Sequence, residues 1–426
     1  MIADWSAWLT PQPLFNEVTS PTKLTGWQIA AGPFGLLYFI PWIPVVRLIA
    51  RRFPVGAIVT TGVLWTLLTI SPFSTLYFLT YVGIGATWVV LLGKARKRGT
   101  LGERGMIALT WIGLHLWALP AWLHADIFAY GWEWTPGGNL AVLHALGIAY
   151  FLFRFVGWGV DWAKNPHLSL RPAETIAWIM YPPVMRLGPV MPREVFLERF
   201  ENWRPAAPLP WREIGKHVGW FLAGGLLLAG VQMNTPVPPE GARDFFRSPS
   251  DYSTNALLRI FYFVPIRIYL ILWLYNELAA IVSFSVGIRA DNNFDMLPRA
   301  TSVRDFWRRW HITVGAWLRK YIYIPLGGNR GFVEWHYIAV FGYCGIWHGA
   351  SWSFLAWGLS QGIALAVQRW WDLLRIRLGW GTEWKHPLWV AFCWLLTMHY
   401  QLATILMFTD FDLLGTRFFP ELLSRF

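Results

Sequence analysis

The chain has 426 residues, of which 55% are hydrophobic and only 14% are charged. A soluble globular domain rarely has so few charges, so charge-free runs of about 20 residues predict a multi-pass membrane protein. The formal net charge of +12 does not indicate a nucleic-acid partner, because the basic residues fall in short connectors between apolar runs, as in cytoplasmic loops.

Apolar runs in the first half of the chain predict a series of membrane-spanning helices. The first run covers residues 27–46, and two helices fit between residues 52 and 94, with a break at the Ser-Pro pair 71–72. The connector KARKRGTLGERG at 94–105 is the densest basic cluster in this half, so we expect it in the cytoplasm. Further spans are expected at 105–125, 134–153 and 217–239.

Two other stretches depart from a regular span. Residues 174–191 are broken by prolines and predict a re-entrant or interfacial hairpin, which a membrane tolerates only when it is buried in protein. Residues 256–288 are apolar but carry Arg259, Arg267 and Glu277. Charges in such a run usually face a protein interior or a wet cavity, although a long arginine side chain could also reach an interface.

Two last runs, at 337–368 and 386–409, complete the membrane portion, so that about nine to eleven spanning or re-entrant helices are expected in an all-α protein. The chain starts MIADWSAWL, with an acid where a signal peptide has its basic region, so no cleaved signal is expected. Cys344 and Cys393 lie in apolar surroundings without zinc-type spacing, and Cys344 is expected to pack rather than to act as a nucleophile.

A basic amphipathic segment covers residues 302–324. Ser302, with Asp305 three residues later, predicts a helix start, and apolar residues then recur at helical spacing while basic residues fill the remaining arc. We expect this helix to lie near the membrane interface and to end before Pro325. His311 falls on the boundary between the two faces, where a histidine is either a structural residue or part of a site.

His348 lies in GYCGIWHGASW, within 32 residues that contain no Asp, Glu, Lys or Arg. An ionisable group in such a run indicates a functional site. A neutral imidazole is the form of a general base, which could take the proton from a hydroxyl that attacks an acyl donor. From the residues alone, a satisfied core histidine or a cofactor ligand stays open. Small residues here allow a neighbouring helix to approach closely: Gly342, Gly345 and Gly349.

Two blocks of this region resemble the membrane-bound O-acyltransferase family, especially its bacterial branch of alginate O-acetylation and D-alanyl transfer proteins. RDFWRRWHITVGAWLRKYIYIPLGGNRG at 304–331 is similar to the family's most distinctive block. GIWHGASWSFLAWGLSQG at 345–362 is similar to the second block, which holds the family's catalytic histidine. Weaker similarity extends to 181–196 and to Asn293 and Phe294, so the resemblance covers the second half firmly and the first half by hydropathy.

The resemblance implies a funnel of tilted helices in a single membrane domain over 1–426, with N-terminal helices at 27–239 and catalytic helices at 256–409. His348 would activate the acceptor hydroxyl, and His311 would orient the acceptor or stabilise developing charge. Six further residues are expected to bind substrate: Arg308, Arg309, Asn329, Trp347, Tyr275 and Glu277. A lipid-facing or structural role is the alternative for the two arginines and the asparagine.

One segment departs from the family pattern. Where this branch usually reads Asp-Phe-Ser-Gly-Tyr-Ser-Asp, the chain reads ILWLYNE at 271–277. Tyr275 is retained and Glu277 replaces the last acid, but Ile271 replaces the first acid and the Ser-Gly pair is lost. The departure implies an unusual acceptor or donor, or a loss of catalysis.

The leading hypothesis is an inner-membrane O-acyltransferase that passes an acetyl group from a thioester, acetyl-CoA or an acyl carrier, to hydroxyls of an exported or cell-envelope glycan. Neither a tightly bound cofactor nor a metal is expected. The expected partners are the acyl donor, the glycan, the lipid bilayer and a periplasmic acyltransferase. The alternatives are a long-chain protein or lipid acyltransferase of the same family, and a non-enzymatic acyl-relay or transport component whose histidines gate a proton or bind haem.

Overall fold

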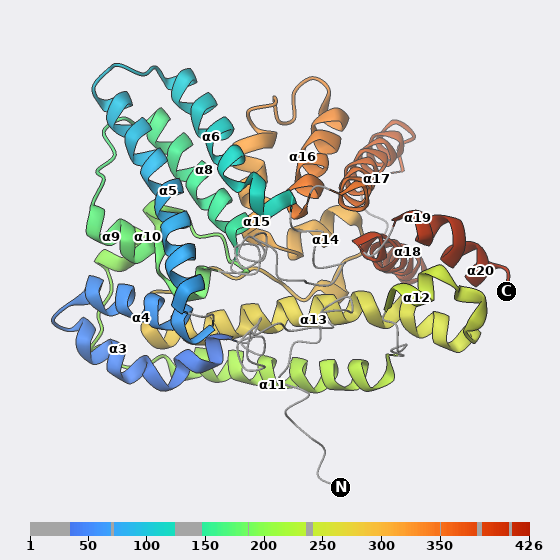
Figure 1. Cartoon of the computed structure of the whole chain (residues 1–426). Coiled ribbons are helices and arrows are strands. Elements are labelled where there is room, and N and C mark those ends of the chain that lie inside the picture. The colour runs from blue at the N-terminus through green and yellow to red at the C-terminus, as the bar shows by residue number, and fades with distance from the viewer. Residues whose placement is uncertain are drawn as a thin grey trace, which may run out of the picture. The chain divides into compact units, whose positions relative to one another are not determined.

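The computed structural model describes residues 35–69, 72–123, 147–185, 187–235, 242–349, 351–380, 386–408 and 411–426. Within these ranges the chain forms α-helices with short 3₁₀ and π segments and no strand, which confirms the predicted all-α class (Figure 1). Four described helices are long and apolar enough to cross a membrane: Thr75–Lys97, Trp211–Asn234, Thr254–Val286 and Pro387–Ile405.

The described residues divide into two compact units that interleave along the sequence. The first unit extends to Gly224 and includes Leu272–Asn292, whereas the second has Gly225–Ile271 and Asn293–Phe426. Helix α13 (Thr254–Val286) therefore contributes its first part to the second unit and its last part to the first.

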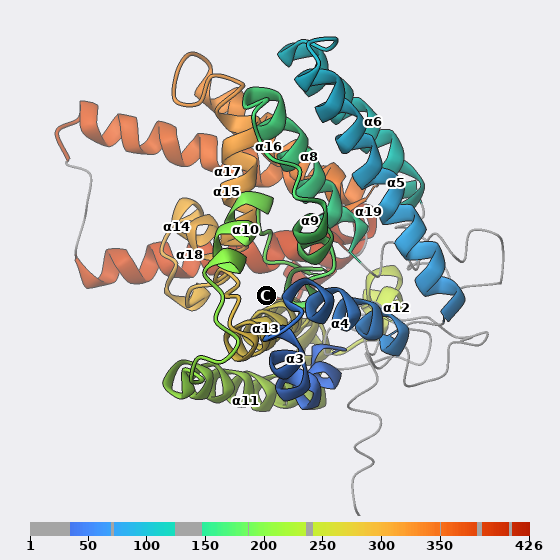
Figure 2. The same cartoon turned by 90° about the vertical axis from the view of Figure 1, so that its left-hand side faces the viewer.

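In the first unit, α5, α6 and α8 pack against one another, as Figures 1 and 2 show. Their core is aromatic, with Phe151, Phe155 and Trp158 of α8 buried, and a Cβ at Gly93 of α5 would lie 2.6 Å from the Trp162 ring. Besides the end of α13, the unit comprises η1 (Gly35–Trp42), α3 (Ile43–Ala50), α4 (Pro54–Thr69), α5 (Pro72–Lys97), α6 (Glu103–Leu123), α8 (Ile148–Lys164), α9 (Pro172–Ile179), η3 (Pro182–Val184), α10 (Arg193–Glu201) and most of α11 (Trp211–Asn234).

Several of the predicted apolar runs are helical, and one boundary differs. Helices α4 and α5 fill the two runs predicted between residues 52 and 94, α6 covers most of 105–125, and the segment 174–191 is broken into α9, η3 and an extended stretch. The run 134–153 lies mostly outside the described residues. Its predicted end is wrong, because α8 continues to Lys164 with its aromatic side chains still buried.

In the second unit, α16 and α17 form an extensive helix pair, and α14 and α18 pack against α17 (Figure 1). Besides the start of α13, the unit comprises α12 (Ala242–Arg247), η4 (Pro249–Asp251), η5 (Leu297–Arg299), α14 (Val303–Arg309), α15 (Ile312–Leu318), the π-helical η6 (Arg319–Tyr323), α16 (Val333–His348), α17 (Trp352–Arg377), α18 (Pro387–Ile405), η7 (Leu406–Phe408), α19 (Phe411–Leu413), the π-helical η8 (Leu414–Phe418) and α20 (Phe419–Leu423).

The charge-free run 337–368 is not one helix. Helix α16 ends at His348, and Gly349 continues in an extended conformation (φ 163°, ψ 160°) that lies outside the helical region. Helix α17 then begins with Ser351 as its N-cap, whose Oγ accepts a hydrogen bond from Ser353 N at 3.1 Å. Gly349 therefore ends a helix, whereas the predicted spacing had placed it in a helix contact.

The two helices of this pair return along one another with their backbones in contact. A Cβ at Gly362 of α17 would lie 2.6 Å from Ile338 Cα of α16, and one at Gly345 of α16 would lie 2.3 Å from the Phe354 carbonyl oxygen of α17 and 3.2 Å from Gly358 Cα. Because a Cβ does not approach backbone atoms within 3.0 Å, only glycine fits at these crossings. The predicted close approach is therefore confirmed at Gly345, and its partners are the glycines of α17.

Candidate active site

His311 lies at a break between two short helices. Helix α14 begins at Ser302, whose Oγ accepts a hydrogen bond from Asp305 N at 3.1 Å, as predicted. The helix ends at Arg309, and His311 adopts a left-handed backbone conformation (φ 44°, ψ 51°) before α15 starts. The predicted continuous helix over 302–324 is therefore wrong, because hydrogen bonds to a neighbouring loop interrupt it.

Asn293 is the residue of that loop that holds the break. Its backbone carbonyl accepts a hydrogen bond from Ile312 N at 3.0 Å, and its side-chain Oδ1 accepts two from Thr313, from N at 3.0 Å and from Oγ1 at 2.8 Å. Because this oxygen is occupied, the Asn293 amide nitrogen faces His311 and donates to Nδ1 at 3.2 Å. The network thus assigns the proton of a neutral His311 ring to Nε2.

Burial determines the charge of His311. The residue is only 7% exposed, and its ring centroid lies 5.1 Å from Phe294 and 5.2 Å from Trp310. Desolvation lowers the pKa of His311 to about 4, so the ring is neutral at physiological pH. A neutral ring with its proton on Nε2 is a hydrogen-bond donor that can orient a substrate or stabilise a negative oxygen.

Acid should destabilise the folded chain through His311. Because its folded pKa of about 4 lies below the ordinary value of 6.5, the stability from the neutral ring is complete above pH 6.5 and is lost as the pH falls toward 4. The expected loss is up to about 3 kcal/mol, seen as a lower thermal unfolding midpoint in detergent. His311→Asn tolerates the left-handed backbone and should flatten this pH dependence. An equal slope in both proteins would contradict the assignment.

His348 is the last residue of α16, and aromatic rings surround it. The ring centroids of Trp347, Trp357 and Phe354 lie 4.5, 5.2 and 5.9 Å from its own. His348 is half-buried, whereas Trp347 and Trp357 are buried. The last carbonyls of α16 carry partial negative charge, which stabilises a positive imidazolium formed when the ring accepts a proton. At this position the imidazole is partly accessible to a substrate, and the helix end stabilises the positive charge that the ring carries after it accepts a proton.

Trp307 and Trp357 link the segments that carry the two histidines. Their ring centroids are 5.9 Å apart, and the Trp307 indole nitrogen donates to Gln361 Oε1 at 3.1 Å. Gln361 is fully buried; its Oε1 also accepts from Gln401 Nε2 at 3.1 Å, and its Nε2 donates to Thr404 Oγ1 at 2.9 Å. This network ties α14 to α17 and α18. We did not predict it, although two glutamines in charge-free runs were a usable signal.

The other predicted residues of the second unit differ in their surroundings. Trp347 is buried against His348. Arg308 is exposed, whereas Arg309 is neutralised by Asp305 and Asp295, each at 3.1 Å. Asn329 is exposed and accepts a hydrogen bond from a tyrosine hydroxyl at 2.6 Å. Substrate contact by these residues stays a prediction, and Arg309 has a clear structural role.

Tyr275 and Glu277 belong to the first unit, where both are buried in α13. Glu277 Oε2 lies 2.6 Å from His217 Nδ1 of α11, and its Oε1 accepts a hydrogen bond from Trp273 Nε1 at 2.8 Å. His217 and Glu277 are 7% and 4% exposed, so the altered segment 271–277 supplies the acid of a buried His-Glu pair. His217 was not predicted as a site residue, although an ionisable group opening the apolar run 217–239 was a signal.

Breaking the His217–Glu277 pair should destabilise the chain. His217→Leu leaves a buried carboxylate without its imidazole partner, so the free energy of unfolding should fall by about 3–5 kcal/mol. The double variant His217→Leu/Glu277→Leu removes both polar groups and should recover most of that loss. Thermal unfolding of the detergent-solubilised proteins measures both effects. A double variant as unstable as the single one would show that the loss of stability does not come from the unpaired carboxylate.

The described part of the second unit offers a proton acceptor and a hydrogen-bond donor, carried by His348 and His311. Among the described residues, no three of His, Cys, Asp or Glu cluster as a metal site requires. Cys344 is a free thiol buried in α16, in keeping with its expected packing role. The chemistry that these groups support is transfer to a hydroxyl whose proton a histidine removes.

Comparisons with known proteins place both histidines inside a matched region. The model of the membrane-bound O-acyltransferase family matches residues 140–409. Peptidoglycan O-acetyltransferase of Helicobacter pylori is 46% identical over 98 residues, 22% of this chain and 19% of that protein. The probable alginate O-acetylase AlgI of Azotobacter vinelandii is 38% identical over 127 residues, 29% of this chain and 24% of that protein.

Teichoic acid D-alanyltransferase of Streptococcus thermophilus shares a longer region at lower identity, 25% over 257 residues, which is 56% of this chain and 60% of that protein. The chain therefore matches about a fifth to three fifths of the length of these relatives.

Proposed function

The chain belongs to the membrane-bound O-acyltransferase family, and we propose that it transfers an acetyl group from a thioester donor to hydroxyls of an exported or cell-envelope glycan. With four long apolar helices among its described residues, this family member is a multi-pass membrane protein. The names of its relatives give peptidoglycan, alginate and teichoic acid as the polymers that they modify, and two of the three transfer acetyl groups. These names support a glycan acceptor and a short acyl group.

The observation that carries this proposal is the position of His348. It is a half-buried histidine at the end of a helix, in an aromatic cradle inside a charge-free run. In the proposed reaction the neutral ring takes the proton from the acceptor hydroxyl while that oxygen bonds to the thioester carbonyl carbon. The C–S bond then breaks, and the leaving thiolate takes the proton from the imidazolium, so no net proton is released.

His311 is proposed to act beside this step without exchanging a proton. Its Nδ1 accepts a hydrogen bond from Asn293, so Nε2–H is the remaining hydrogen-bond donor of the neutral ring. A fixed donor of this kind holds the acceptor hydroxyl or the negative oxygen of the tetrahedral intermediate. Removing one such donor typically lowers the rate of acyl transfer by about 10²- to 10³-fold.

The acyl donor, the partner proteins and the location in the inner membrane are also proposals. Acetyl-CoA or an acyl carrier supplies the thioester, and the acetyl group passes in the inner membrane to the glycan, either directly or through a periplasmic acyltransferase. Arg308 and Asn329 are exposed polar residues of the matched blocks, which supports a contact with the donor. Tyr275 and Glu277 are buried, so we propose that they affect substrate binding indirectly, by fixing the packing of α13.

Acyl transfer in isolated membranes tests the proposed function. Membranes with and without the chain are supplied with radiolabelled acetyl-CoA or a long-chain acyl-CoA, and base-labile label in the glycan and lipid fractions is counted. We expect acetyl label in the glycan fraction only when the chain is present. Label from the long-chain donor in protein or lipid would overturn the short-acyl proposal, and no label from either donor would overturn the enzyme proposal in these membranes.

A further inference from the structure

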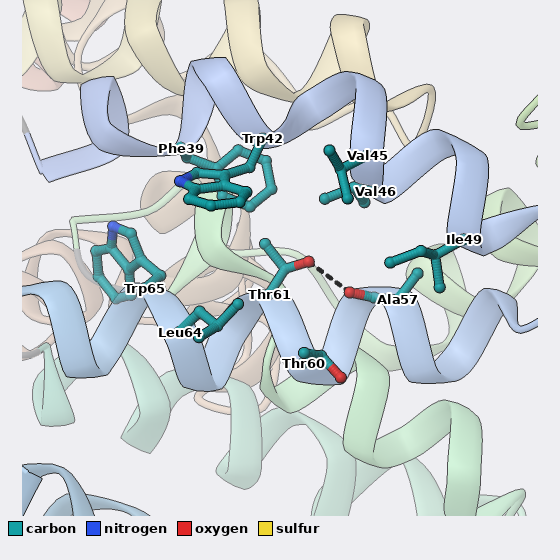
Figure 3. A pocket seen from close by; sticks show the side chains of 10 residues that line it. All are labelled: Phe39, Trp42, Val45, Val46, Ile49, Ala57, Thr60, Thr61, Leu64 and Trp65. Carbon is teal, nitrogen blue, oxygen red and sulfur yellow. Dashed lines mark hydrogen bonds between the residues drawn. The ribbon is translucent and has the colours of Figure 1, made fainter.

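The helical hairpin of η1, α3 and α4 in the first unit carries an apolar groove (Figure 3). Side chains of η1 and α3, such as Phe39 and Ile49, face side chains of α4 such as Leu64 and Trp65 across it. The groove has a volume of about 80 Å³. The α4 side is about 12 Å long at 1.5 Å per residue, so the groove suits part of a single extended hydrocarbon chain.

The groove is open to the surroundings of the protein. Trp42, Val45, Ile49 and Leu64 line it and remain 51%, 44%, 44% and 45% exposed. The Thr61 hydroxyl within it donates to the Ala57 carbonyl of its own helix and is therefore already satisfied. In a multi-pass membrane protein, an open groove lined in this way is suited to the acyl chains of lipids.

Uncompensated positive charge lies at the Ile49 end of the groove, in the turn from α3 to α4. The Arg47 guanidinium donates hydrogen bonds to the backbone carbonyls of Ser285 and Ala207, so it binds the protein and not a headgroup. Arg51 and Arg52 are exposed and form no ion pair with any residue that the structure describes. No Asp or Glu occurs in the sequence between Glu17 and Glu103, so this part of the chain supplies no acid to neutralise them.

We propose that this hairpin binds an anionic phospholipid, with an acyl chain in the groove and the headgroup phosphate on Arg51 and Arg52. Arginine pairs well with phosphate, because its planar guanidinium forms two parallel hydrogen bonds to the oxygens. A net negative headgroup complements two unneutralised arginines, whereas the cationic group of a zwitterionic headgroup is repelled by them. The hairpin belongs to the first unit, whereas both histidines of the proposed reaction belong to the second.

Photolabelling of the full chain in nanodiscs tests the site. The probe is phosphatidylglycerol with a diazirine in its acyl chain, compared with phosphatidylcholine that carries the same chain, and the labelled peptides are identified by mass spectrometry. We expect label within residues 36–65, roughly tenfold stronger from phosphatidylglycerol, because each arginine near an anionic headgroup strengthens the binding of that lipid. Arg51→Gln/Arg52→Gln should reduce the label to the phosphatidylcholine level.

Two further variants distinguish the contribution of the arginine charges to lipid binding from that of the groove. Lys97→Gln/Arg98→Gln removes the same charge from an exposed basic pair at the end of α5 and should leave the label within 36–65 unchanged. Thr60→Trp fills the groove from an exposed position, keeps both arginines and should abolish the label there. Equal labelling by the two lipids, an equal loss in the Lys97/Arg98 variant, or label confined to other peptides would overturn the proposal.

Discussion

Replacing His348 with alanine should lower the rate of acetyl transfer by about 10²- to 10⁴-fold, the usual contribution of a positioned proton acceptor. The ring is the group that removes the acceptor proton in the proposed reaction, and alanine has no atom that can do so. Because His348 is half-buried at a helix end, the chain should still fold. Initial rates in membranes that contain equal amounts of each protein measure the effect.

Two variants control this comparison. His386→Ala removes an exposed histidine at the start of α18 and should leave the rate unchanged. His348→Gln keeps a polar side chain in the aromatic cradle but does not accept a proton at neutral pH, so it should be as inactive as the alanine variant. Retention of near-normal activity by either His348 variant, with normal protein levels, would remove the histidine from the proposed mechanism.

The two histidines differ in how far the sequence could predict them. An ionisable residue in a long charge-free run is a local feature, so His348 could be identified without knowing the fold. His311 was identified as a residue, but its surroundings were not, because the helix break at His311 depends on Asn293, 18 residues away. Periodicity reports which residues can share a face and does not report a loop that interrupts the helix.

Pairs that form between helices distant in the sequence were the least predictable feature of either unit. His217 and Glu277 are 60 residues apart, and Trp307 and Gln361 are 54 apart. Each residue alone is compatible with solvent, lipid or a partner, and only the packed helices decide which. Glycine spacing predicted that α16 would be approached closely, but the choice of Gly358 and Gly362 as its partners required the turn at Gly349.

Gly345→Ala should destabilise the second unit and lower acetyl transfer with it. The new Cβ would meet the Phe354 carbonyl and the Gly358 backbone of α17, which cannot move away without separating the two helices. Overpacking of this kind typically costs about 1–3 kcal/mol, and here it opposes backbone atoms, so the upper end is expected. Because α17 carries Trp357, separation would also displace a ring that lies 5.2 Å from His348.

Gly342→Ala, one helical turn earlier, is the matched control for that substitution. Its Cβ would lie 3.4 Å from Leu359 Cδ2, the end of a flexible side chain, which is ordinary contact. Alanine also favours a helix over glycine by about 1 kcal/mol, so this variant should unfold at the same or a higher temperature and keep its activity. If both alanine variants behaved alike, the close approach of α17 at Gly345 would not be what positions His348, and the ring would have to be held by its aromatic neighbours alone.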